Sequence, residues 1–333
     1  MDASSATAQA HLCKAIEDEI KRSGQVIQKL KYHHNALAPI SRLPPQTLAK
    51  IFSILSLSTD DYEDVPYLEW IRVTHVCHRW REIALSFPYL WSYIDFTELT
   101  LAGITEVLAR AKMSPLHFVA NIFPWNKAQL DALGRQLKAH ISHTRHLSIS
   151  GDFSISGDFQ TVLEQLISPA PVLVSMSLTN SSCPFLPTQR VIPDSLFHAT
   201  APKLTHLELF HCNIGWKSPL LKGLQTLKIR ALFEQAMLMI DDWLAASDEM
   251  SQLKTLFLEN TTPAVSVDNP LISELQRTVT LPSLTHFDIN ASAKSCALTL
   301  AHLVLPALIL LRVTSRSQSL EGDDVRFVIP YVA

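Results

Sequence analysis

Histidine is the residue type whose spacing comes closest to a chemical site in this 333-residue sequence. His140, His143 and His146 lie three residues apart, and His75 and His78 repeat that step. On a helix an i,i+3 pair of histidines can ligate zinc, but catalytic zinc needs a third ligand and a supporting shell. Because His146 falls where a strand is expected to start, the first three histidines would not share one helical face. We therefore expect no metal site at either group.

Other sequence signatures of catalysis are missing. The chain has no Gly-x-x-x-x-Gly-Lys-Ser/Thr loop, no Gly-x-Ser-x-Gly, no His-Glu-x-x-His and no calcium-loop pattern. Glycine accounts for only 8 residues, which weighs against glycine-rich phosphate loops. The five cysteines are scattered, odd in number and without a Cys-x-x-Cys pair, so neither a disulfide framework nor a zinc module is expected. We expect a protein that is not an enzyme and needs no cofactor.

The composition indicates which binding partners and which cellular compartment to expect. A hydrophobic content of 47% supplies ample apolar surface for a core, and a net charge of −3 argues against a nucleic-acid partner. No signal-peptide pattern opens the chain. The longest run without charge, residues 295–311, is at the short end of a membrane span and contains Pro306. A soluble intracellular protein of the cytoplasm, the nucleus or both, with no membrane partner, is the expectation.

The first element that the pattern predicts is a helix from about residue 8 to Leu37. Its apolar positions follow alternating steps of four and three, the spacing of a heptad seam: Ile16, Ile20, Ser23, Ile27, Leu30, His34 and Leu37. Ser23 and His34 weaken this seam. Two interpretations stand, an amphipathic helix packed on the next domain or a coiled coil that dimerises. The first is favoured, and with it a monomeric chain.

Two further helices are predicted after the helix-breaking Pro39. One starts near Pro44 and shows a single apolar face made of Leu48, Ile51, Phe52 and Leu55. The other covers residues 68–85, with an apolar face made of Val73, Val76, Cys77, Trp80 and Ala84. Between them, residues 58–64 carry four acids and are typical of a solvated loop.

Residues 40–95 resemble an F-box, and more narrowly the F-box-like proteins abundant in mushroom-forming fungi. The resemblance rests on Leu43-Pro44, Leu48, Ile51-Phe52, Leu55, the run Val-Thr-His-Val-Cys-His-Arg-Trp-Arg at 73–81, and Pro-Tyr-Leu-Trp at 88–91. Gln46, where an acid is common, and the acidic insertion between the helices depart from the pattern.

The resemblance implies a helical hairpin that docks the Skp adaptor of a cullin–RING ubiquitin ligase. Such a short hairpin buries too little surface to be stable alone, which agrees with a docking role. The residues expected to form or brace the adaptor surface are Leu43, Pro44, Leu48, Ile51, Phe52, Leu55, Val76, Cys77 and Trp80. Some of them must also be internal core, and the sequence does not assign each one.

A six-residue phrase, Leu-x-x-Leu-x-Leu, recurs from about residue 140. Its clearest copy starts at Leu204, and related copies start at 224, 253 and 284, with weaker ones near 145, 173 and 308. From Leu173 the steps are 31, 20, 29, 31 and 24 residues, which resembles an irregular leucine-rich repeat. Strand and helix, repeated, predict a curved solenoid with the strands on its concave side. A generic α/β domain with leucine-rich strands is the alternative.

Side chains between the phrase leucines are expected to point outward, because side chains alternate along a strand. They mix aromatic, basic and acidic residues, which suits a protein target: Glu208, Phe210, Lys228, Arg230, Phe257 and Glu259, followed by Asp288 and Asn290. Aromatic and Arg side chains are the usual energetic anchors, here Phe210, Arg230 and Phe257. The competing interpretation is that these side chains are merely solvated and that the target binds a loop or the C-terminal end.

The predicted organisation is of the α+β or α/β repeat type. It consists of an N-terminal coiled-coil-like helix at 1–38, an F-box at 39–96, a linker or capping region with helices and one strand at 97–140, and an irregular leucine-rich-repeat domain at 141–333. A polar capping repeat is missing from the end, which predicts an atypical or incomplete C-terminus. The expected function is substrate recognition for a Skp–cullin–RING ubiquitin ligase, with an unknown protein as target. The alternative is a repeat scaffold whose F-box-like hairpin no longer binds the adaptor.

Overall fold

A computed structural model describes residues 3–57, 69–122, 127–151, 158–181, 191–230, 240–261, 277–315 and 325–330. The chain divides into two compact units, Met1–Trp91 and Ser92–Ala333. The predicted acidic loop at 58–64 lies outside the described residues.

The first unit is helical throughout its described part. Its elements are α1 (Ala3–Leu37), the 3-10 helix η1 (Pro39–Arg42), α2 (Pro45–Leu57), η2 (Glu69–His75), α3 (His78–Ser86) and η3 (Pro88–Trp91). α2 begins at the predicted proline pair, where a missing N–H and a fixed φ suit the first turn of a helix.

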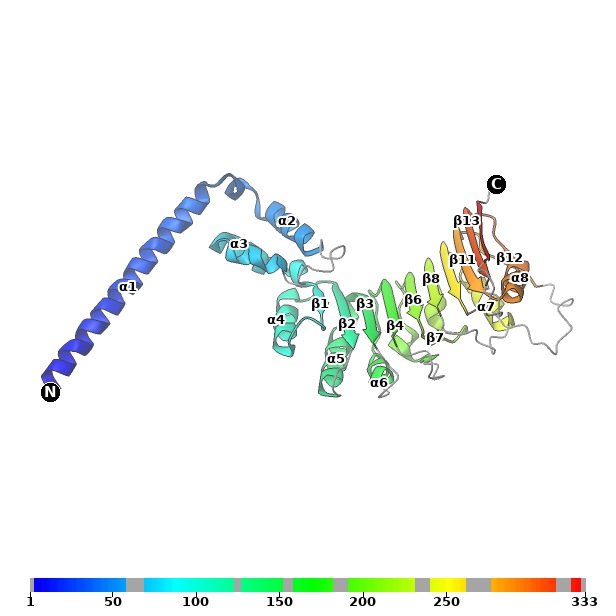
Figure 1. The fold of residues 1–333 in the computed structure, drawn as a ribbon, viewed down its shortest axis with the longest axis horizontal. Coiled ribbons are helices and arrows are strands. Elements are labelled where there is room, and N and C mark those ends of the chain that lie inside the picture. The colour runs from blue at the N-terminus through cyan, green and yellow to red at the C-terminus, as the bar shows by residue number, and fades with distance from the viewer. Residues whose placement is uncertain are drawn as a thin grey trace. The chain divides into compact units, whose positions relative to one another are not determined.

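The long helix α1 does not pack as expected. It forms one continuous helix (Figure 1), but every seam residue from Ile16 to Leu37 is exposed. Leu37 is 80% exposed and Ile20 is 67% exposed. The favoured expectation, an apolar face buried on the neighbouring domain, is therefore wrong for this helix.

The helix predicted at 68–85 is interrupted rather than continuous. η2 ends at His75, Cys77 adopts an extended conformation with φ −159° and ψ 166°, and α3 starts at His78. Cys77 is thus a helix N-cap position and does not lie on an apolar helix face. For the same reason His75 and His78 belong to two different helices.

The second unit is built on a ten-stranded sheet whose strands are ordered as they occur in the chain. All neighbours are parallel except the last pair, β13 and β14. The strands are β1 (Tyr93–Asp95), β2 (Leu116–Ile122), β3 (Thr144–Gly151), β4 (Ser175–Asn180), β6 (His206–Phe210), β8 (Thr226–Arg230), β9 (Thr255–Glu259), β11 (His286–Ala291), β13 (Leu310–Ser315) and β14 (Val325–Pro330).

Helices and short strand pairs join the long strands. The helices α4, α5 and α6 lie along the same side of the sheet (Figure 1). The connecting elements are α4 (Leu101–Ala111), α5 (Lys127–His140), η4 (Ile141–His143), α6 (Asp158–Gln165), η5 (Leu196–Ala199), η6 (Pro219–Leu221), α7 (Ile240–Glu249) and α8 (Ala293–Ala301), with the parallel pairs β5 (Val191–Ile192) with β7 (Asn213–Ile214) and β10 (Val279–Thr280) with β12 (Leu303–Val304).

The phrase leucines form the core beneath this sheet. In the copies that start at 173, 204, 224, 253 and 284, all three apolar positions are at most 3% exposed. The prediction that they point inward is confirmed. Each rung therefore buries three large apolar side chains, and each such side chain contributes about 1.5–3 kcal/mol.

The sheet extends further towards the N-terminus than the repeated phrase does. β1 starts at Tyr93, within the stretch expected to close the F-box, and β2 pairs directly with β3. The described residues between 97 and 140 contain the helices α4 and α5 and the strand β2, and this strand makes them part of the sheet. The uncharged run at 295–311 divides among α8, β12 and β13, and none of the described helices is long and apolar enough to cross a membrane.

Candidate functional site

Helix α2 has two apolar faces, one of which is buried while the other is exposed to solvent. Leu48 and Phe52 are fully buried, because the spacing of four places them on the side that packs on α3 and η2. Ile51, Ile54 and Leu55 stay 38%, 55% and 47% exposed. A short helix that leaves three branched apolar side chains in solvent carries a surface suited to another protein.

The structure separates the predicted adaptor residues into two sets. Leu48 and Phe52 are core, and the half-buried Trp80 packs on Phe52 with ring centroids 5.2 Å apart. These three residues support a surface rather than form one. The remaining predicted residues are at least partly accessible: Leu43, Pro44, Ile51, Leu55, Val76 and Cys77.

Two apolar side chains of this surface were missed by the sequence reasoning. Ile54 lies i+3 from Ile51, so the helical periodicity contained the signal for it. Ile40, 41% exposed, lies in η1 just before the proline pair. No periodic pattern marks it, because a single 3-10 turn is too short to show one.

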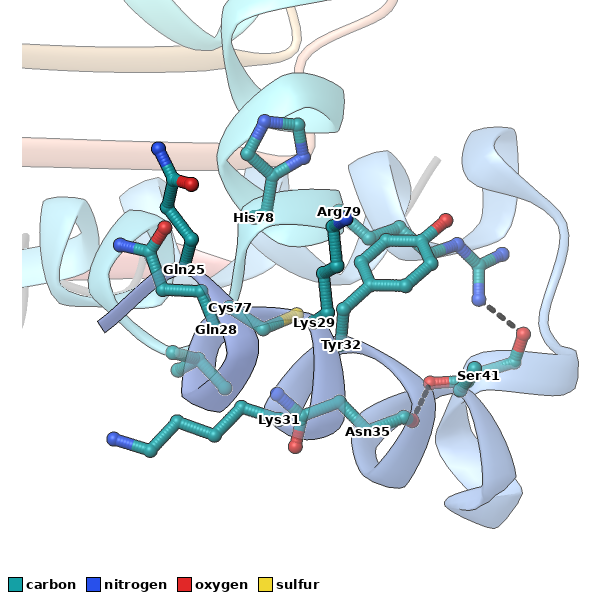
Figure 2. Close-up of a pocket in the computed structure, with 12 residues that line it drawn as sticks. Gln25, Gln28, Lys29, Lys31, Tyr32, Asn35, Ser41, Cys77, His78 and Arg79 are labelled. Atoms are coloured by element: carbon teal, nitrogen blue, oxygen red, sulfur yellow. Dashed lines mark hydrogen bonds between the residues drawn. The ribbon is translucent and has the colours of Figure 1, made fainter. Parts of the chain in front are cut away.

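Arg79 fixes the segment that leads into α2. Its guanidinium donates from Nη1 to the carbonyl of Ser41 and from Nη2 to the carbonyl of Leu43, the latter at 2.6 Å. The Ser41 hydroxyl in turn donates to the carbonyl of Asn35 at 2.7 Å (Figure 2). Charge-assisted donors thereby occupy carbonyls at the end of η1 that no helical N–H reaches.

A groove of about 830 Å³ lies beside this network. Figure 2 shows that its lining comes from the second half of α1, from Ser41 of η1, and from Cys77 with the start of α3. Gln28, Lys29, Tyr32 and His78 contribute polar groups to a lining that also contains apolar surface. These four side chains are all exposed, as is typical of a groove on the protein surface.

A cap of aromatic residues closes the helical unit. Trp91 is 1% exposed, and its Nε1 donates to the carbonyl of Ala84 at 2.8 Å. The ring of Trp70 lies against it with centroids 5.0 Å apart. A buried Trp whose N–H finds a backbone partner contributes its full apolar area without an unsatisfied donor.

Comparison with known protein families agrees with this geometry. Residues 40–97 match the F-box-like family. They form an F-box-like domain. No curated protein matches the chain.

The match covers the residues whose arrangement was just described. The F-box-like domain includes the Arg79 network, both faces of α2 and the aromatic cap. Its end at 97 lies beyond β1, the first strand of the sheet. The chain therefore has an F-box-like region followed by an α/β region with a parallel sheet.

The outward face of that sheet carries the predicted target-binding residues. The register places Glu208 opposite Lys228, and Lys228 opposite Phe257. A second row runs from Phe210 through Arg230 to Glu259. The prediction that these side chains are neighbours on one face is confirmed, and each of them is half-buried or exposed.

Arg230 lies at the centre of this surface. Its guanidinium carbon is 5.0 Å from the ring centroid of Phe210 and 5.2 Å from that of Phe257. Its Nε is 2.5 Å from one carboxylate oxygen of Glu259, Oε2, and the side-chain amide of Asn290 donates to the other oxygen, Oε1, at 3.2 Å. Two aromatic rings and one carboxylate therefore surround the cation, and its contacts lie within the chain.

Neighbouring ion pairs complete the surface. Lys228 pairs with Glu208 at 2.6 Å, and Arg312 pairs with Asp288 at 2.9 Å. With Ser177, Thr179 and the Phe210–Arg230–Phe257 cluster they line a hollow of about 400 Å³. Ser177, Thr179 and Arg312 were not among the predicted residues. They occupy the same phrase positions in the weaker copies at 173 and 308, so the same rule would have found them.

The histidines do not assemble into a metal centre. His140 and His143 are adjacent, with Nδ1 and Nε2 3.4 Å apart, but His146 lies in β3 beside His117 of β2. Burial lowers the pKa of all three histidines of the 140–146 group. Among the described residues no three His, Cys, Asp or Glu side chains are grouped so that they could hold a metal ion.

Proposed function

We propose that this chain is the substrate-recognition subunit of a Skp–cullin–RING ubiquitin ligase. In this role the F-box-like domain binds the Skp adaptor, and the sheet face around Arg230 binds the protein to be modified. The chain itself performs no chemistry. It raises the rate of ubiquitin transfer by holding a lysine of the target near the charged enzyme of the complex.

The observation that carries the proposal is the uncovered apolar face of α2 within the F-box-like match. Ile51, Ile54 and Leu55 are solvent-exposed, although the same helix buries Leu48 and Phe52 completely. Exposed apolar side chains on an otherwise well-packed helix favour a protein partner. Pro44, Val76 and Ile40 extend the apolar character of this unit.

We further propose that residues 141–333 form an irregular leucine-rich repeat. Strands that follow one another in chain order, each beside its sequence neighbour, support this assignment. So does the burial of all three apolar positions in five of the phrases. The Arg230 cluster then lies on the sheet surface that such repeats use for binding.

Co-purification of the full chain with the Skp adaptor tests the proposal. The double variant Leu43→Ala with Pro44→Ala, and separately Ile51→Asp with Leu55→Asp, should weaken adaptor binding at least about tenfold, since each large apolar contact contributes about 1.5–3 kcal/mol. The matched control is Met113→Asp. Met113 is 74% exposed and lies in the α/β region, outside the F-box-like domain.

Two results would contradict the proposal. If the unaltered chain fails to retain the adaptor, the F-box-like domain has a scaffold role instead. If both double variants retain the adaptor as well as the control does, the adaptor does not use this face of α2.

The target surface needs a separate test. Replacing Phe210, Arg230 and Phe257 together by Ala should abolish capture of a target while adaptor binding persists. A target that is still modified at the normal rate by this triple variant would place the recognition site elsewhere on the chain.

A further inference from the structure

Helix α1 carries a row of apolar side chains that nothing in the described part of the chain covers. Ile16, Ile20, Ile27, Leu30 and Leu37 are all more than half exposed. They recur at heptad spacing, so in a helix they form one continuous stripe. Single exposed apolar residues are ordinary, but a stripe of this length is typical of an interaction surface.

The heptad frame assigns each residue of α1 a position. Ile20 and Ile27 take position a, and Ile16, Leu30 and Leu37 take position d. The polar residues of the stripe are Ser23 at d and His34 at a. Cys13 is the a residue one heptad before Ile20.

The charges of α1 are segregated along its length. Glu17, Asp18 and Glu19 are consecutive, whereas residues 20–37 hold Lys21, Arg22, Lys29 and Lys31 and no acid. This distribution makes the helix acidic in its middle and basic towards its C-terminus. A copy of the same helix running in the opposite direction presents the complementary charges.

We propose that α1 forms an antiparallel two-stranded coiled coil with α1 of a second copy of the chain. One register satisfies both the seam and the charges, namely the one in which paired residue numbers in the core sum to 50. It sets Ile20 of one chain against Leu30 of the other. The other core layers pair Cys13 with Leu37, Ile16 with His34, and Ser23 with Ile27.

The flanking positions of this register bring opposite charges together. At the e positions Glu17 faces Lys31 of the other copy, twice because of the two-fold symmetry. At the g positions Glu19 faces His33. Among the described residues Glu19 pairs with Arg22 at 2.8 Å, and this highly exposed ion pair contributes little and can rearrange.

The parallel arrangement lacks these features. It would place the acidic segment 17–19 against itself and the basic segment 29–31 against itself. It would also stack Ser23 on Ser23 and His34 on His34 in the core. In the antiparallel register each of these polar residues meets an isoleucine, and no core layer pairs two polar side chains.

A dimer through α1 would bring two copies of each binding surface together. Two copies would carry two F-box-like domains and two Arg230 clusters. The residues that continue from α1 towards each F-box-like domain would start at opposite ends of the coil, about 36 Å apart for 24 helical steps. Such a pair would bind a target with two recognition segments more tightly than one copy alone.

Sedimentation equilibrium of the full chain is the first test. We expect twice the 37.2 kDa chain mass at micromolar concentration. Ile20→Asp with Ile27→Asp should return the mass to that of one chain. The matched control, Gln25→Asp with Gln28→Asp, adds the same charges outside the seam and should leave the dimer intact. A single-chain mass for the unaltered protein overturns the proposal.

A charge exchange tests the direction. Glu17→Lys alone or Lys31→Glu alone places like charges opposite each other and should weaken the dimer by about tenfold, counting two pairs. The double exchange should restore the original dissociation constant, because the pairs become complementary again. If the double variant is as weak as the single variants, the antiparallel register is wrong.

The native cysteine gives an independent measurement. Cys13 of one copy and Cys13 of the other should be too far apart to cross-link, whereas Leu37→Cys should create a disulfide with Cys13 of the partner under mild oxidation. Adding Cys13→Ala to Leu37→Cys should abolish that product on a non-reducing gel. Cross-linking of the unaltered chain that is lost with Cys13→Ala would show parallel helices and overturn the proposal.

Discussion

The guanidinium of Arg79 donates to the backbone carbonyl of Leu43 at 2.6 Å, across 36 positions of the sequence. The same side chain also reaches the carbonyl of Ser41. Arg79 sits in the first turn of α3, and its two acceptors lie just before α2. One side chain therefore determines where the Leu43-Pro44 segment lies relative to α3, and with it the start of the surface that we assign to the adaptor.

Arg79→Met should loosen this segment. The change leaves two carbonyls without their donor while keeping much of the apolar stem, so the local free energy of opening should fall by about 1–3 kcal/mol. Hydrogen exchange of residues 40–57 measures that opening directly. The control is Arg81→Met, at an exposed position two residues away. Equal protection in the two variants would show that Arg79 does not hold the segment.

The two faces of α2 should respond differently to truncation. Phe52→Ala removes a fully buried ring that contacts Trp80 and should destabilise the F-box-like domain by about 3–5 kcal/mol. Ile51→Ala, one residue earlier and 38% exposed, should change stability by much less, within about 1 kcal/mol. Chemical denaturation of both variants compares them. If Ile51→Ala is as harmful as Phe52→Ala, the exposed face of α2 is covered within the chain.

Much of the second unit was predictable because its pattern is dense and local. A leucine phrase repeated at Leu204, Leu224 and Leu253 fixes which side chains of each strand point inward. Since neighbouring strands share one register, the same phrase also predicted that Phe210, Arg230 and Phe257 would meet. The structure adds the cation–π distances around Arg230, whereas the sequence already predicted that these three side chains are neighbours.

The helical unit was less predictable because its decisive contacts are not periodic. Cys77 is an N-cap without the usual Ser, Thr, Asp or Asn, so the interruption before α3 had no local signal. The bond from Arg79 to Leu43 joins distant segments that no spacing rule connects. The stripe on α1 was visible in the sequence, but its exposure was not, because burial depends on where the rest of the chain packs.

The thiol of Cys212 should be chemically silent in the folded protein. It is 1% exposed, and burial raises its pKa to about 12, although a hydrogen bond with the backbone of Asn180 acts in the opposite direction. At about pH 8.5, near the pKa of an ordinary thiol, almost no Cys212 thiolate exists. Iodoacetamide at that pH should therefore label the exposed Cys13 and leave Cys212 unmodified until denaturant is added. Mass spectrometry of the peptides distinguishes the two, and rapid native labelling of Cys212 would contradict its burial.

Protonation of the histidines at the junction of α5 and β3 should destabilise that junction as the pH falls. Burial lowers the pKa of His140 below the ordinary 6.5, and the nearby His143 lowers it further. The pKa of His143 is lowered by burial as well, and this side chain is only 8% exposed. The unfolded chain thus binds protons more readily than the folded chain at pH values between the folded pKa and 6.5.

The sign of the effect follows from that difference in proton binding. Above about pH 6.5, where both histidines are neutral in the folded and the unfolded chain, the junction has its full stability. Stability from these groups is lost as the pH falls from there towards the lowered folded pKa, and it does not fall further below that value. Hydrogen exchange of residues 136–151, corrected for intrinsic rates, should show faster opening at about pH 5.5 than at about pH 7.5.

A double variant isolates the two rings. With His140→Gln and His143→Gln the local opening free energy should depend less on pH, even if it is lower overall, because neither glutamine can take up a proton. His75→Gln, at an exposed position in the F-box-like domain, is the control and should keep the original dependence. A pH dependence that is unchanged in the double variant would assign the effect to other groups, and His146, whose pKa is lowered by burial, by Arg145 and by His206, would be the next residue to replace.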